Sequence, residues 1–146
     1  MAPPYQRILL AVDLSKDSRV VGQRARALAS ALDAQLLIIH VVEPIPIVPP
    51  MPPDPIVPVT VTTQIELMEA AQEQIGQLAR ELGVSEDRWT VVEGHIKTEI
   101  LRIAADENVD LIVVGSREKH GLTFLITPTE DVVVHKAPCD VLAIRL

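Results

Sequence analysis

The chain has 146 residues, of which 48% are hydrophobic and only 2% aromatic, and its formal net charge is −7. A chain of this length forms one core, which here must be built from aliphatic side chains, as in parallel strands covered by helices. The acidic balance and the lack of a basic stripe argue against a nucleic-acid partner, because phosphate binding depends on clustered Lys and Arg. Cys139 is the single cysteine, so no internal disulfide forms, and no apolar run reaches the roughly 18 residues of a membrane span. We therefore expect a cytoplasmic protein without a membrane contact.

The first part of the chain alternates aliphatic runs with an amphipathic segment. Residues 8–12 are a continuous aliphatic run and residues 35–42 are a second, largely aliphatic segment, and both predict buried strands. Between them, apolar residues recur at helical spacing and predict a helix that Ser15 or Ser18 caps. The predicted buried face of this helix holds Val21, Ala25, Leu28 and Leu32.

A Pro-rich insert follows at about residues 43–59. Its prolines are too dense for the interior of a helix or a sheet, so we expect an extended, exposed, polyproline-like segment. Aliphatic residues lie between the prolines. Two interpretations stay open: a connector draped over the domain, or a docking surface for a protein partner.

The second part of the chain continues the alternation. Helical spacing predicts a long helix over 60–82 that Gly83 ends. One face of it carries Ile65, Met68, Ala71, Ile75, Leu78 and Leu82. The further predicted elements are a strand over 89–92, a helix over 97–107, a strand over 111–114, a loop over 116–126, a helix over 128–135 and a strand over 141–145. Alternating strands and helices predict an α/β fold: a parallel sheet with helices on both faces.

Such a sheet binds ligands in the crevice at the carboxyl ends of its strands, where the strand order reverses. Asp13 and Gly115 end two of the predicted strands. They are therefore the first candidate site residues.

Four ordered motifs resemble those of universal stress proteins. They read ILLAVDLSKDS, LLIIHVVEP, DLIVVGS and HKAPCDVLAIRL, and the match spans nearly the whole chain apart from the Pro-rich insert. The resemblance, which is greatest to small single-domain bacterial members, implies one domain over 1–146 with a Rossmann-like, adenine nucleotide alpha hydrolase-like fold. It implies an open five-stranded sheet in the order 3-2-1-4-5 and a homodimer in which the last strands meet. The apolar strand VLAIRL supports that dimer independently, because an uncovered edge promotes association.

Many members of this family bind ATP through a glycine-rich signature, G-x-x-G followed later by G-[S/T], whose backbone amides hold the phosphates. Gly115 and Ser116 match its first element, but Glu118 replaces the second glycine, and Thr127 and Pro128 replace the later pair. A carboxylate repels phosphate, and proline has no N–H to donate. Thr127 and Pro128 also fit the capped start of a helix, which uses the free amides itself. We therefore expect tight ATP binding to be lost or much weakened.

The resemblance also implies which contacts would remain if ATP or AMP were bound weakly. It places Asp13 and the backbone around Val41 at the adenine, Gly115 with Ser116 beside the ribose or α-phosphate, and Arg117, Lys119 and Thr129 at phosphate oxygens. The alternative is that Asp13 only caps the following turn and that Arg117 is a solvated loop charge. Both readings stay open at this point.

No pattern in the chain indicates catalysis or a metal site. Ser116 and His120 share a loop, but no carboxylate is spaced to orient the histidine, and the histidines have no metal-ligand spacing. Cys139 fits core packing. We predict a non-catalytic, stress-response regulatory homodimer with a degenerate nucleotide site, no resident cofactor and no metal. The alternative is a sensor module that still binds ATP or AMP in the crevice between the first and fourth strands.

Overall fold

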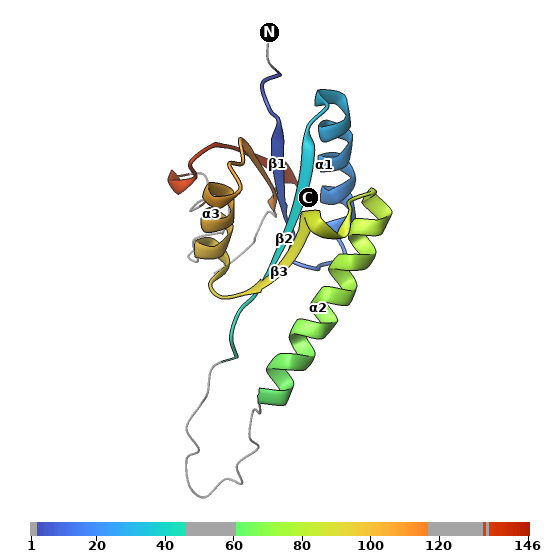
Figure 1. Cartoon of the computed structure of the whole chain (residues 1–146), viewed down its shortest axis with the longest axis vertical. Coiled ribbons are helices and arrows are strands. Elements are labelled where there is room, and N and C mark those ends of the chain that lie inside the picture. Colours follow the sequence, from blue (N-terminus) through green and yellow to red (C-terminus); the bar gives the residue numbers. More distant parts are fainter. Residues whose placement is uncertain (1–2, 46–60, 117–132, 134) are drawn as a thin grey trace, which may run out of the picture.

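The computed structural model describes residues 3–45, 61–116, 133 and 135–146. Within these ranges the strands form one five-stranded sheet in the order β3-β2-β1-β4-β5, as predicted, with every pair of neighbours parallel (Figure 1). The strands are β1 (Arg7–Ala11), β2 (Gln35–Val42), β3 (Trp89–Glu93), β4 (Leu111–Ser116) and β5 (Asp140–Arg145). The helices are α1 (Ser18–Leu32), α2 (Val61–Leu82) and α3 (Ile96–Asp106), with a short 3-10 helix, η1 (Glu86–Arg88), before β3.

Helices cover both faces of the sheet, α1 and α2 on one side and α3 on the other (Figure 1). Because successive residues of a strand point to opposite faces, Ile8 and Leu10 pack with α1 and α2, whereas Leu9 packs with α3. All these side chains are buried. Burial on both faces explains why the central strands are mostly aliphatic in sequence.

The predicted cap of the first helix is wrong. Asp17 is the N-cap residue of α1 and makes no side-chain cap hydrogen bond, and Ser18 is already the first helical residue. The backbone N–H of Ser15 and the hydroxyl of Ser18 both donate to Oδ1 of Asp13, at 3.0 and 3.3 Å. The Ser15 N–H and the Ser18 hydroxyl therefore both bond to Asp13 in the turn that follows β1.

The long helix α2 extends beyond the sheet at its N-terminal end (Figure 1). Ala71, Ile75 and Leu78 are buried in the core, as their spacing predicted, but Ile65 is 51% exposed. Helical periodicity shows which residues share a face. It does not show where the sheet beneath that face ends.

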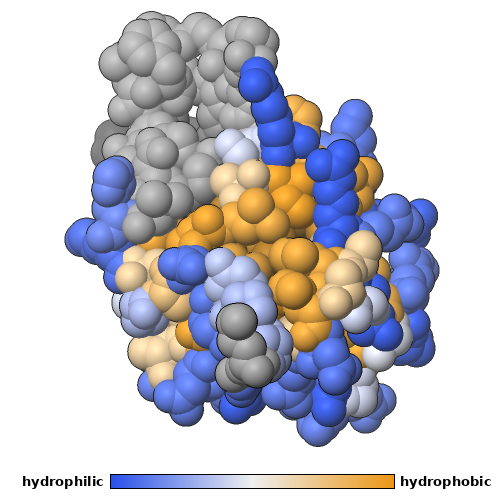
Figure 2. Space-filling model, turned by 90° about the horizontal axis from the view of Figure 1, so that it is seen from above, coloured by the Kyte–Doolittle hydropathy of each residue, from blue (hydrophilic) through white to orange (hydrophobic). Residues whose placement is uncertain are grey.

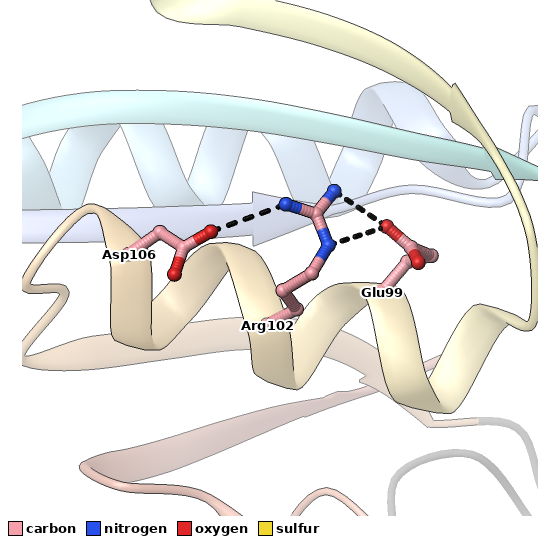
Figure 3. A network of polar contacts seen from close by, with 3 residues as sticks. All are labelled: Glu99, Arg102 and Asp106. Atoms are coloured by element: carbon pink, nitrogen blue, oxygen red, sulfur yellow. Dashed lines mark hydrogen bonds and ion pairs between the residues drawn. The ribbon is translucent and has the colours of Figure 1, made fainter.

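The outer surface of α3 carries a small ionic network (Figure 3). Arg102 donates from Nε and Nη2 to Oε2 of Glu99, at 2.9 and 2.6 Å, and from Nη1 to Oδ2 of Asp106 at 3.1 Å. These contacts link successive turns of the helix whose inner side holds Ile96 and Ile100 at the pocket described below.

Several predictions concern residues outside the described ranges. They include most of the Pro-rich insert, with its docking role, and nearly all of the helix over 128–135. The extent of the single domain, 1–146, also stays a prediction. No helix in the described ranges is long and apolar enough to cross a membrane.

Candidate functional site

A pocket of about 250 Å³ lies at the carboxyl ends of β1, β2 and β4. This is the place where the strand order reverses, since β2 lies on one side of β1 and β4 on the other. The wall is mostly aliphatic, with Ile96 and Ile100 contributed by α3 and Val21 by α1. Its polar side chains are Asp13, Ser15, Asp17, Ser18 and His40.

The fold brings together some of the predicted site residues. Asp13, Val41 and Gly115 all line the pocket, from the ends of β1, β2 and β4. Ser116 is half-buried at the end of β4, and its carbonyl oxygen accepts a hydrogen bond from the Leu146 N–H at 2.9 Å. The predicted residues outside the described ranges are Arg117, Glu118, Lys119, Thr127, Pro128 and Thr129. Whether any of these residues contacts a nucleotide stays a prediction.

Asp13 has a structural role in the turn after β1. Its Oδ1 atom accepts from the Ser15 N–H two residues later, which is the hydrogen bond of an Asx-turn, and also from the Ser18 hydroxyl. The intervening Leu14 has a φ of 61°, a left-handed conformation that is costly for a residue with a Cβ. Asp13 thus stabilises a strained turn at the mouth of the pocket, which is the role of a turn cap named as the alternative above.

His40 is a pocket residue that the sequence did not single out. Its Nδ1 lies 2.8 Å from the carbonyl oxygen of Val12. A carbonyl oxygen can only accept, so Nδ1 carries the proton in this contact. The Val12 N–H donates to the carbonyl oxygen of Ile39 at 3.1 Å. Val12 is therefore held to β2 through both of its backbone groups, one residue beyond the end of β1.

Gly115 is covered by two aliphatic side chains of the chain itself. A Cβ placed on it would lie 3.1 Å from Cδ1 of Leu146 and 3.1 Å from Cγ2 of Val21. Both distances are shorter than ordinary van der Waals contact, so a larger residue would displace one of these neighbours. The sequence indicated a glycine that lets phosphate approach the backbone. In the structure, Leu146 and Val21 lie on the side of the glycine to which a Cβ would point.

The described residues of the pocket wall carry negative charge. Asp13 and Asp17 contribute carboxylates, and no Lys or Arg is among the described residues of the wall. This described part of the wall, mainly aliphatic with a few polar groups, suits an uncharged heterocycle better than a polyanion.

The chain matches the sequence model of the universal stress protein family over residues 4–145. It belongs to this family. A relative among characterised sequences is universal stress protein A homolog 2 of Coxiella burnetii, which is 36% identical over 143 residues, covering 97% of this chain and 96% of the relative.

Solved structures agree with the fold of this universal stress protein. UspA from Lactobacillus plantarum superposes with a TM-score of 0.70 at 25% identity, covering 97% of this chain and 98% of that one. A universal stress protein crystallised in complex with cAMP also has a TM-score of 0.70, at 20% identity, with 97% of each chain covered. At that lower identity the likeness concerns the fold alone.

Proposed function

We propose that this universal stress protein is a non-catalytic regulatory homodimer whose nucleotide site no longer holds ATP tightly. The observation that carries the proposal is the packing of Leu146 and Val21 against Gly115, because these side chains occupy space beside its backbone that a ribose or phosphate would need for a close approach. The replacement of the family signature by Glu118, Thr127 and Pro128 supports the same conclusion from the sequence.

The charges of the wall add to this argument. Asp13 and Asp17 place carboxylates on the described part of the wall, so the phosphates of ATP would add negative charge to a pocket that is already negative. Two like charges about 4 Å apart repel by about 1 kcal/mol in water and by several times more where solvent is partly excluded. Adenosine carries no charge and escapes this repulsion, so affinity should fall as phosphates are added.

Calorimetric titration with adenosine, AMP, ADP and ATP tests the proposal. We expect no submicromolar binding of ATP, and an affinity that decreases from adenosine to ATP. In the variant Asp17→Asn, ATP should gain affinity whereas adenosine should not. Submicromolar ATP binding to the unaltered protein would refute the proposal.

A nucleotide-sensing module is the second candidate function. One observation favours it: Asp13, Val41 and Gly115, which the family resemblance places at the base and ribose, line a single pocket. The solved relative in complex with cAMP has the same fold. Micromolar AMP binding that changes the subunit association would support this function over the first.

The homodimer part of the proposal concerns β5, which pairs with β4 alone among the described strands. On this edge strand Leu142 is 40% exposed, although it is a large apolar residue. Hydrophobic side chains also gather in a broad area of one face of the molecule, bordered by hydrophilic ones (Figure 2). Unpaired edges and apolar areas of this kind are covered by partners in stable proteins.

Native mass spectrometry and sedimentation velocity measure the subunit number directly. Leu142→Lys places a charge on the edge and should shift the protein to monomer. Ile65→Lys is a matched control, because Ile65 is similarly exposed but lies on α2. If Leu142→Lys leaves a dimer intact, the interface lies elsewhere.

A further inference from the structure

We propose that Leu146 is a specificity-determining residue that blocks access of ligands to the backbone of Gly115. The inference rests on the proposed function, since it takes the pocket at the ends of β1, β2 and β4 as the ligand site. It adds a residue from the far end of the sequence to that site. Neither the glycine-rich signature nor the turn after β1 contains this residue.

The main chain of Leu146 is held in place. The last register pair of β4 and β5 joins Ser116 to Arg145, and the Leu146 N–H then donates to the Ser116 carbonyl oxygen at 2.9 Å. This contact extends the pairing with β4 by one residue beyond β5. It positions the Leu146 side chain beside Gly115, the residue before Ser116, where its Cδ1 meets the space that a Cβ would fill.

The two side chains that cover Gly115 differ in how firmly they are packed. Val21 is 3% exposed and belongs to the core between α1 and the sheet, whereas Leu146 is 37% exposed at the end of an edge strand. The free energy lost on moving a side chain scales with the apolar area that it buries. Leu146 is therefore the side chain that a ligand would displace.

A ligand that approaches this side of Gly115 binds only when Leu146 has moved away. Its apparent Kd equals the Kd for the open pocket divided by the fraction of time for which the pocket is open. Shortening Leu146 to alanine removes the obstacle and leaves the backbone hydrogen bond to Ser116. The affinity for a ligand with a ribose and one phosphate should then increase.

The test is calorimetric titration with AMP of the unaltered protein, Leu146→Ala and Leu67→Ala. We expect the Kd of AMP to fall by about ten-fold in Leu146→Ala, as for a pocket open about a tenth of the time. Leu67→Ala is the matched control, because it removes the same atoms from a leucine of similar exposure that lies on α2 and does not line the pocket. Its Kd should not change.

An equal or higher Kd in Leu146→Ala would overturn the inference, and so would a failure of both proteins to bind AMP at millimolar concentration. These results differ from failure of the proposed function, which is submicromolar binding of ATP to the unaltered protein. A strong gain of AMP affinity in Leu67→Ala would also overturn the inference, because the effect would then not be specific to the pocket.

A second measurement tests the contact without any ligand. Gly115→Ala places a methyl group 3.1 Å from the Leu146 side chain and should lower the melting temperature. In the Leu146→Ala background, where that neighbour is absent, the same substitution should lower the melting temperature less. Equal losses in the two backgrounds would mean that Leu146 does not cover Gly115, and the inference would fall.

Discussion

The imidazole of His40 continues the pairing between β1 and β2 past the point where β1 ends. Its Nδ1 donates to the carbonyl oxygen of Val12 at 2.8 Å, just after the last register pair of the two strands, Ala11 with Ile39. Val12 is only 8% exposed, so its carbonyl has little access to water. The contact also fixes the residue that precedes Asp13 at the mouth of the pocket.

The loss of stability on replacing His40 should therefore depend on whether the new side chain can donate a hydrogen bond to the Val12 carbonyl oxygen. His40→Ala leaves the buried carbonyl of Val12 without its partner and should lower the free energy of unfolding by about 1–3 kcal/mol. His40→Asn places an amide N–H near the position of Nδ1 and should recover most of this loss. Urea unfolding followed by the fluorescence of Trp89, the single tryptophan, measures both values.

His40→Gln is the control for this experiment. Its amide reaches toward the position of Nε2 and not of Nδ1, so it should behave like alanine. If the asparagine and glutamine variants are equally destabilised, the hydrogen bond to Val12 is not what the histidine contributes.

Replacing Asp33 at the end of α1 by glycine should stabilise the protein. Asp33 follows the helix with a φ of 54°, and its N–H bonds to the carbonyl oxygens of Ala29 and Ser30. A left-handed residue with a Cβ is strained, and glycine is the usual residue at this position. Asp33→Gly should raise the free energy of unfolding by about 0.5–1 kcal/mol. Denaturant unfolding provides the measurement.

Asn108, with a φ of 52°, provides a comparison at the end of α3. Asparagine tolerates the left-handed conformation better than most residues. Asn108→Gly should therefore stabilise less than Asp33→Gly. A loss of stability in Asp33→Gly would show that its carboxylate contributes more than the strain removes.

The central strands could be predicted from the sequence because burial on both faces produces aliphatic runs, whereas the strand order was predicted from the family resemblance. Strand ends are less certain, yet the runs that end at Asp13 and Gly115 located two residues of the pocket correctly. His40 and Leu146 could not be identified in this way. Their roles depend on which residue lies opposite them in a neighbouring strand, and a single sequence does not show strand register.

Tyr5 provides a pH-dependent contact between the segment before β1 and the start of β5. Its hydroxyl donates to Oδ2 of Asp140 at 2.8 Å, and this hydrogen bond raises the pKa of Tyr5 above its ordinary value near 10. The folded protein thus binds the phenolic proton more tightly than the unfolded chain. The resulting stability is fully present below the ordinary pKa and is lost as the pH rises through the folded value.

Tyr5 is the single tyrosine, so the absorbance of its phenolate reports this titration directly. We expect a midpoint above that of a free tyrosine and a lower midpoint in Asp140→Asn. In Tyr5→Phe, the loss of stability that accompanies this titration should be absent. A midpoint unchanged by Asp140→Asn would contradict the assigned hydrogen bond.

Cys139 should be an unreactive thiol, in keeping with the packing role that its position before the last strand predicted. It is half-buried against the core on the α3 side of the sheet. Burial raises the pKa of this thiol, and the negative charges of Asp140 and Asp110 raise it further. At neutral pH the thiol is therefore protonated, and only the thiolate is nucleophilic.

Alkylation of Cys139 by iodoacetamide should be slower in the folded protein than in urea by on the order of ten-fold or more. Mass spectrometry can follow the reaction because the chain has a single cysteine. Asp140→Asn should accelerate the reaction only modestly, because burial is the larger cause. Alkylation of the folded protein at the rate of the unfolded chain would show that Cys139 is open to solvent.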